Sequence, residues 1–127
     1  MVISNYKDLE IWKRSVELTI NIYSITTHYP KTEIFGITSQ MRRAVTSVAA
    51  NIAEGWTRKG ENSVIYFLNV ANGSLSELET FLIISGRLNY LDSEQSMKIE
   101  NEINEISKMI YGLKRYLKDH QSLKLKQ

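Results

Sequence analysis

The stretch IENEINEISKMIYGLKRYL, residues 99–117, carries the clearest periodic pattern in the chain. Its apolar residues recur at alternating steps of four and three: Ile99, Ile103, Ile106, Ile110, Leu113 and Leu117. This spacing places them along one face of an α-helix. A heptad-like seam of this kind is typical of helices that pack at a shallow angle, as they do in four-helix bundles. The stretch therefore predicts a helical bundle.

The remainder of the chain supplies three further stretches with helical periodicity. Together with the first, they predict helices over residues 8–27, 38–58, 62–89 and 93–119. No strand pattern and no internal repeat competes with this interpretation. The predicted fold is all-α, an antiparallel up-down four-helix bundle that forms a single domain over residues 1–127.

Local signals place the ends of the predicted helices. The single proline, Pro30, ends the first helix because proline cannot continue one. Thr38 or Ser39 is the expected N-cap of the second helix. Asp92, followed three residues later by Gln95, forms a capping box at the start of the fourth helix.

The first predicted helix carries two apolar stripes. The stripe assigned to the core contains Leu9, Trp12, Val16, Thr19 and Tyr23. A bundle core needs about one stripe per helix, so the second stripe is expected at the surface, where apolar patches mark contacts with partners. We therefore expect a homo-oligomer with these residues of the second stripe at or near the interface: Ile11, Leu18, Ile22 and Ile25.

Composition excludes several classes of protein. Cysteine is absent, which removes disulfide frameworks and cysteine zinc sites. The N-terminal residues have no apolar core of a signal peptide. Unbroken apolar runs such as FLII at residues 81–84 are far shorter than the roughly 20 residues of a membrane span. We expect a soluble cytoplasmic protein that does not bind membranes.

No pattern of residues indicates an enzyme. His28 and His120 lie at the ends of predicted helices, outside the Glu-x-x-His pairs of di-iron bundles. Gly55 and Gly60 have the spacing of a phosphate-binding loop, but Glu61 occupies the position of its lysine. We predict no catalytic, cofactor-binding or metal-binding residues. We interpret these glutamates as a solvated face: Glu77, Glu79, Glu100, Glu102 and Glu105.

The stretch RRAVTSVAANIAEGW, residues 42–56, places a row of polar residues beside the apolar stripe of the second helix. Several alanines there allow a neighbouring helix to come close, so polar groups must find partners within the protein. We interpret Ser47, Asn51 and Glu54 as a buried or semi-buried structural network, with a ligand site as the alternative. Gly55 is expected to allow close approach of a neighbouring segment.

Three segments together resemble the bacterial four helix bundle protein family: YKDLEIWKRSVEL, YPKTEIFGITSQMRRAVTSVAANIAEGW and FLNVANGSLSELETFL. Founding members of that family are encoded in intervening sequences of large-subunit ribosomal RNA genes. The resemblance covers about residues 5–117. It implies an up-down bundle that assembles into a ring-like homopentamer. Distant relatives include the accessory variability determinant of diversity-generating retroelements, a basic pentameric barrel that binds nucleic acid and a reverse transcriptase. The resemblance carries over no catalytic residues.

Basic residues cluster in two parts of the sequence. Arg42, Arg43, Arg58 and Lys59 lie on or after the second helix, and Lys114, Arg115, Lys118, Lys124 and Lys126 lie near the C-terminus. Oligomerisation would multiply such patches, and multiplied phosphate contacts strengthen binding to nucleic acid. We therefore predict a non-enzymatic, oligomeric protein that associates with RNA or DNA. The alternatives are cations that only complement solvated helix ends, and a protein-interaction adaptor or scaffold.

Overall fold

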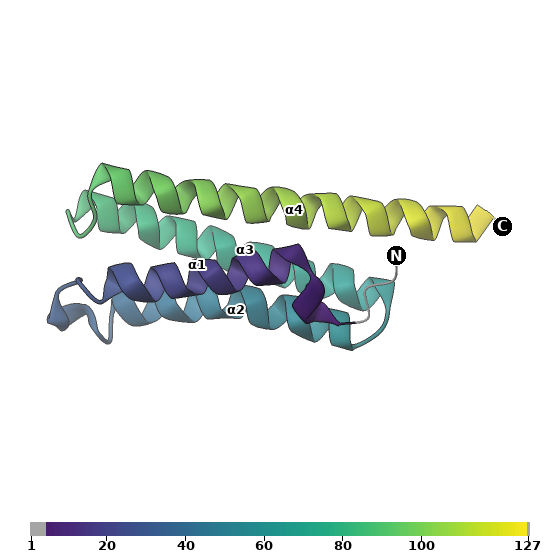
Figure 1. Cartoon of the computed structure of the whole chain (residues 1–127), viewed down its shortest axis with the longest axis horizontal. Coiled ribbons are helices and arrows are strands. Elements are labelled where there is room, and N and C mark those ends of the chain that lie inside the picture. The colour runs from purple at the N-terminus through teal and green to yellow at the C-terminus, as the bar shows by residue number, and fades with distance from the viewer. Residues whose placement is uncertain (1–4, 127) are drawn as a thin grey trace.

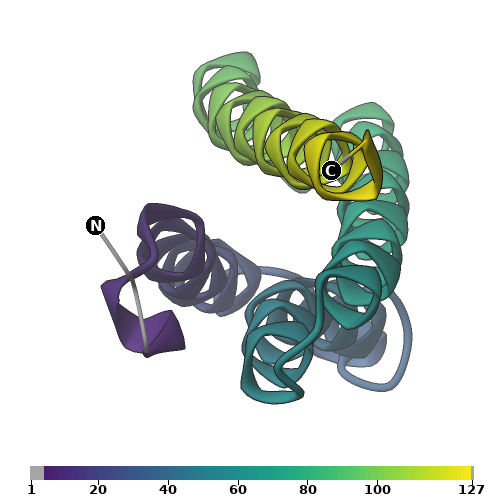
Figure 2. The same ribbon diagram turned by 90° about the vertical axis from the view of Figure 1, so that its right-hand side faces the viewer.

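The computed structural model describes residues 5–126, with side chains for residues 5–120. Its four α-helices are α1 (Glu10–Thr26), α2 (Ile37–Thr57), α3 (Glu61–Arg87) and α4 (Ser93–Lys126). Short 3-10 helices, η1 (Tyr6–Asp8) and η2 (Lys31–Glu33), precede α1 and α2. Successive α-helices run antiparallel (Figure 1) and surround a common core (Figure 2). Residues 5–126 contain no strand, and the predicted all-α four-helix bundle is confirmed.

The core face predicted for the fourth helix is confirmed, and α3 buries a face of the same kind. On α3 the buried positions are Val64, Leu68, Ala71, Leu75, Leu78, Leu82 and Ser85. On α4 the seam buries Ile99, Ile103, Ile106, Ile110 and Leu117, with Leu113 partly buried against it. None of the described helices combines the length and apolar content needed to span a bilayer.

The core face of α1 differs from the predicted one. The buried residues of α1 are Ile11, Ser15, Leu18, Ile22 and Thr26, whereas Tyr23 of the predicted stripe is exposed. Ile11, Leu18 and Ile22 therefore lie in the core of the single chain, and Ile25 is partly buried against that core. The prediction that these residues form a surplus apolar surface for a second copy is wrong.

Two polar residues explain why hydrophobicity alone selects the wrong face of α1. The Ser15 hydroxyl donates a hydrogen bond to the Ile11 carbonyl at 2.6 Å, and the Thr26 hydroxyl donates to the Ile22 carbonyl at 2.7 Å. A hydroxyl that bonds to the preceding helical turn is satisfied without water, so it can be buried. The true core stripe thus contains polar members that an apolar count passes over.

The helix ends agree with the sequence at α4 and differ at α2. The Asp92 carboxylate accepts a hydrogen bond from the Gln95 N–H at 2.8 Å, as the capping box requires. The N-cap of α2 is Gly36, and no side chain caps it. Ser39 instead donates its hydroxyl to the Gly36 carbonyl at 3.1 Å, and Thr38 is buried. The C-terminal helix continues to Lys126, past the predicted end at 119, because no proline or glycine interrupts it there.

The helices α2 and α3 make the most extensive contact in the bundle, and α1 and α4 the least extensive of the neighbouring pairs. At the end of α2, a Cβ atom added to Gly55 would lie 2.8 Å from the Phe67 Cβ and 3.4 Å from the Ser63 carbonyl oxygen. Gly55 therefore sets how closely α3 approaches α2. On the opposite side of the bundle, the Asn21 amide joins α1 to α4 by donating to both carboxylate oxygens of Glu102, at 3.0 and 3.1 Å.

Gly55 and Gly73 provide a matched pair of substitutions, because both lie inside helices and only Gly55 is crowded. Gly55→Ala is expected to lower the free energy of unfolding by about 1–3 kcal/mol, since the helices must separate to admit the methyl group. Gly73→Ala, which meets nothing within 4 Å, is expected to raise it by up to about 1 kcal/mol through helix propensity. Urea unfolding of both variants measures the difference, and equal shifts would contradict the close approach.

Candidate nucleic-acid interface

The predicted basic residues lie in two separate places. Arg58 and Lys59 lie at the turn between α2 and α3, at the same end of the bundle as the last turns of α4 (Figure 1). Arg42 and Arg43 lie in the first half of α2, about 22 Å from Arg58 at about 1.5 Å per residue. We call one group the basic end: Arg58, Lys59, Lys114, Arg115 and Lys118. The side chains of Lys124 and Lys126 lie outside the described residues.

Arg42 joins α2 to the end of α1. Its Nε donates to the Thr26 hydroxyl at 3.0 Å, its terminal nitrogen donates to the Tyr23 carbonyl at 3.4 Å, and its guanidinium lies 4.6 Å from the centre of the Tyr23 ring. The last turn of α1 contains no basic residue of its own. Arg42 therefore supplies the positive charge that stabilises the C-terminus of a helix. Its guanidinium is engaged in these contacts within the protein.

The remaining basic side chains of α2 and its following turn are exposed. Arg43 makes no side-chain hydrogen bond or ion pair with the residues that the structure describes. Arg58 lies 5.2 Å from the centre of the Phe67 ring and donates to the Glu54 carboxylate at 2.8 Å. Lys59 adopts a left-handed backbone conformation with φ of 52° in the turn. These contacts leave Arg43 and Lys59 as the freer cations of this part of the chain.

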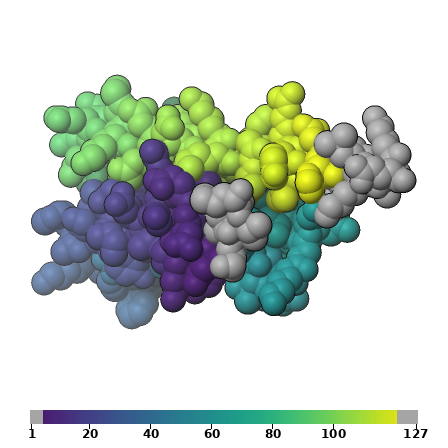
Figure 3. Space-filling model, turned by 45° about the vertical axis from the view of Figure 1, so that its right-hand side comes forward, coloured from purple at the N-terminus to yellow at the C-terminus, as the bar shows by residue number. Residues whose placement is uncertain are grey.

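The C-terminal half of α4 combines basic and aromatic side chains. Tyr111, Lys114, Arg115 and Lys118 share one face of the helix. Together with Asp119 they line a shallow hollow of about 200 Å³. Tyr111 and Tyr116 are both exposed. In Figure 3 this part of α4 lies beside the first turns of α3. The two tyrosines were not among the binding residues predicted from the sequence. Their proximity in the sequence to Lys114, Arg115 and Lys118 could have indicated them.

Two of the three residues of the predicted polar network, Ser47 and Asn51, form connected hydrogen bonds that join α2 to Ser74 of α3. The Asn51 amide donates to the Ser47 hydroxyl at 2.8 Å and to the Ser47 carbonyl at 2.7 Å. The Ser47 hydroxyl in turn lies 2.9 Å from the Ser74 hydroxyl on α3. Two residues before Ser74, the Asn72 side chain accepts a hydrogen bond from the Ser107 hydroxyl of α4 at 3.1 Å. These part-buried bonds fix the axial register of neighbouring helices.

Glu54 lies outside this network. Its side chain is 48% exposed and pairs with Arg58 of the same helix rather than with a residue of another helix. The prediction of a buried or semi-buried Glu54 is therefore wrong. Its position on α2 directs Glu54 to solvent, while the next residue, Gly55, faces α3. An exposed pair of this spacing stabilises a helix by only a few tenths of a kcal/mol.

Two of the glutamates interpreted as a solvated face lie together between α3 and α4. Glu79 and Glu100 share a hydrogen bond, which raises the pKa of Glu100 from its ordinary 4.5 to about 7. Partial burial and the negative charge of Glu79 add to the shift. The sequence did not predict this pair because the two residues belong to different helices. Within the described part of the chain, no three His, Cys, Asp or Glu residues gather closely enough to hold a metal ion.

Comparison with known proteins places this bundle in a family. A family model described as the 23S rRNA-intervening sequence protein matches residues 7–112. The chain belongs to the 23S rRNA-intervening sequence protein family. A solved structure of a protein of unknown function from Bacteroides thetaiotaomicron, assigned to the S23 ribosomal protein family, is similar, with a TM-score of 0.74 and 27% identity over 82% of this chain and 97% of that chain. No curated protein matches this chain significantly.

The family assignment confirms the resemblance found in the sequence. The region that matches the 23S rRNA-intervening sequence protein family includes the Ser47–Asn51 network, Gly55, Arg58 and Lys59. It ends at residue 112, before Lys114, Arg115 and Lys118. The basic end of this member therefore combines residues inside and outside the family match.

Asn51 and Glu54 allow a direct test of which polar residues stabilise the bundle. Asn51→Ala is expected to lower the free energy of unfolding by about 0.5–1.5 kcal/mol, because it removes the hydrogen bonds to Ser47. Glu54→Ala is expected to change it by less than about 0.5 kcal/mol, because its ion pair is exposed. Chemical denaturation of both variants beside the wild type gives the comparison. A larger loss for Glu54→Ala would contradict the assignment.

The Glu79–Glu100 pair predicts a pH dependence of stability. Since the pKa of Glu100 is raised to about 7, the folded chain binds this proton more tightly than the unfolded chain. The bound proton of Glu100 therefore contributes to the free energy of unfolding. This contribution is complete below the ordinary pKa of a glutamate and is lost as pH rises through about 7. Glu100→Gln is therefore expected to flatten the fall in melting temperature between about pH 5.5 and about pH 8. Glu105→Gln, an exposed change on the same helix, should leave that fall intact, and equal behaviour of the two variants would contradict the pairing.

Proposed function

We propose that this member of the 23S rRNA-intervening sequence protein family is a non-enzymatic, oligomeric bundle that binds RNA or DNA through its basic end. The observation that supports the proposal is that cations of the α2–α3 turn and of the C-terminal half of α4 lie at the same end of the bundle. Lysine and arginine contacts to phosphate supply most of the affinity in sequence-independent binding.

An exposed tyrosine beside these cations, Tyr111, favours a single strand over a duplex. Tyr111 lines the hollow with Lys114, Arg115 and Lys118, whereas the exposed Tyr116 lies on another face of α4 and its ring stacks on that of His120. Single-stranded nucleic acid binds to surfaces that combine a basic track with aromatic rings on which bases stack. Unpaired loops and single-stranded segments of RNA are therefore the favoured ligands.

Assembly into a homo-oligomer would strengthen this binding. In a single chain the basic end is small, and Glu54 and Asp119 partly offset its charge. Several copies side by side would present the same patch repeatedly, which raises the effective affinity for one long strand. The resemblance to the bacterial four helix bundle proteins suggests five copies.

A second candidate function is a protein-interaction adaptor or scaffold. It is favoured by exposed apolar side chains at the opposite end of the bundle, among them Phe35, Ile83 and Met97. An adaptor without nucleic-acid affinity would leave the basic end without a ligand. An oligomer that binds nucleic acid would use the basic end for its ligand and the apolar side chains of the opposite end for contacts between copies. The nucleic-acid proposal therefore accounts for more of the molecule.

Retention of single-stranded RNA on a filter, measured at about 50 and about 200 mM salt, tests the proposal. Wild-type protein is expected to bind at the lower salt concentration and to lose affinity steeply at the higher one. Replacing Lys114, Arg115 and Lys118 with Ala should lower the slope of log affinity against log salt by about one for each phosphate that is no longer neutralised.

Two single variants of α4 provide the matched control. Arg115→Ala and Lys98→Ala each remove one exposed positive charge from the same helix, but Lys98 lies near the start of α4, at the other end of the bundle. Only Arg115→Ala should weaken binding appreciably. Equal effects would indicate a response to net charge alone, and absence of binding by the wild type at low salt would exclude the proposal.

A further inference from the structure

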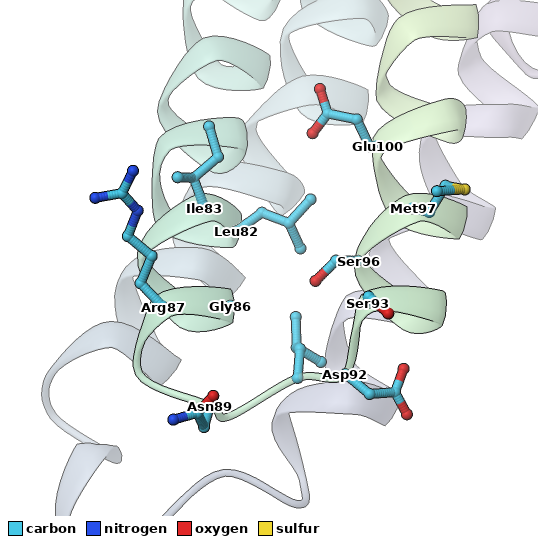
Figure 4. Close-up of a pocket in the computed structure, with 11 residues that line it drawn as sticks. Leu82, Ile83, Gly86, Arg87, Asn89, Asp92, Ser93, Ser96, Met97 and Glu100 are labelled. Carbon is cyan, nitrogen blue, oxygen red and sulfur yellow. The ribbon is translucent and has the colours of Figure 1, made fainter.

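An apolar hollow opens between the last turns of α3 and the first turns of α4 (Figure 4). Its volume is about 670 Å³. Its apolar lining comes from Leu82, Ile83, Leu91 and Met97. Ile83 and Met97 are themselves exposed. The hollow thus combines the size of a binding cavity with apolar side chains that gain from being covered.

The rim of the hollow is mainly acidic. Asp92 and Glu100 lie on it, and Arg87 is the basic residue among its lining residues. Glu79 lies beside Glu100. Such a rim repels phosphate, so nucleic acid is not a suitable occupant. An apolar protein segment with a positive charge beside it is a suitable occupant of the hollow.

The α1–α2 connection of the same chain presents a segment of this kind. Phe35 is 92% exposed in the turn after η2, and its neighbour Ile34 is also exposed. Lys31 opens η2 and is exposed as well. A ring that stays in water contributes no burial free energy to the single chain, and it would contribute such energy if a partner covered it. We call Ile34 and Phe35 the apolar tip.

We propose that the apolar tip of one copy of this chain inserts into the α3–α4 hollow of a second copy. This inference rests on the homo-oligomer of the proposed function and names its interface. A buried aromatic side chain removes about 150–250 Å² from water, and a hollow of about 670 Å³ accepts Phe35 together with Ile34. Lys31 is then available to pair with the acidic rim.

The positions of tip and hollow determine the type of assembly. Both lie at the same end of the bundle, the tip on the α1–α2 connection and the hollow between α3 and α4 (Figure 1). Where each pair of copies shares one tip-in-hollow contact, the interface is heterologous and each added copy leaves one free tip and one free hollow until a ring closes, whereas a two-fold pair that exchanges both tips is already closed. A stable interface buries about 1,200–2,000 Å², to which the exposed Ile84 and Leu88 on the same turns of α3 add apolar area.

Disulfide trapping tests the contact, because the natural chain contains no cysteine. Co-expression of the single variants Phe35→Cys and Met97→Cys is expected to give a disulfide-linked mixed dimer under mild oxidation. Met97→Cys is replaced by Tyr66→Cys in the control. Tyr66 is 62% exposed against 65% for Met97, and it lies in the first turns of α3, at the other end of the bundle. The control pair should not cross-link.

A charge substitution measures the contribution of the tip to assembly. Phe35→Asp is expected to convert the oligomer to folded monomers in light scattering, with the thermal melt showing that the bundle is retained. Tyr66→Asp should remain oligomeric.

The outcomes separate this inference from the proposed function. An oligomeric wild type with no Phe35–Met97 cross-link, or an oligomeric Phe35→Asp variant, would overturn the interface and leave oligomerisation intact. A monomeric wild type would overturn both. Binding of RNA is measured independently on the filter.

Discussion

The close approach of α2 and α3 is the constraint on which the bundle depends. At Gly55 the helix axes are so near that a methyl group would collide with Phe67. The same approach brings the Ser47 and Ser74 hydroxyls to 2.9 Å, where they share one hydrogen bond within the protein. Small residues therefore create a short separation between helices, and that separation requires the few polar groups present to bond within the protein. The register of the bundle follows from those bonds.

The attachment of α1 uses different chemistry. Its core face buries Leu18 and Ile22 together with the hydroxyl residues Ser15 and Thr26. Arg42 of α2 then bonds to the last turn of α1 through Thr26 and Tyr23. Thr26 thus serves the core and the contact with Arg42 at the same time. An arginine that the sequence pattern assigned to nucleic acid is already engaged in holding two helices together.

The two ends of the bundle differ in the partners they can accept. One end gathers Arg58, Lys59 and the basic and aromatic face of α4, which suits phosphates and bases. The other exposes Phe35 on the α1–α2 connection and carries, between α3 and α4, a hollow with an acidic rim, which suits an apolar protein segment. Because the helices are antiparallel, each end collects residues from distant parts of the sequence. The proposed contact between copies would therefore use one end and leave the other end free for the proposed polyanion.

The sequence alone determined the helices, the core faces of α3 and α4, and the Asn51–Ser47 bond, because all of these depend on spacing within one helix. Spacing also predicted the crowding at Gly55, since small residues signal close approach. Only the tertiary structure decided which stripe of α1 is buried, because two stripes fit the same period and the chosen one includes satisfied hydroxyls. The Glu79–Glu100 pair, the engagement of Arg42 with α1, and the placement of Arg58 and Lys59 at the same end of the bundle as the basic residues of α4 likewise needed the fold. Each joins residues of different helices, and no periodicity within a helix specifies which neighbour its outer face will meet.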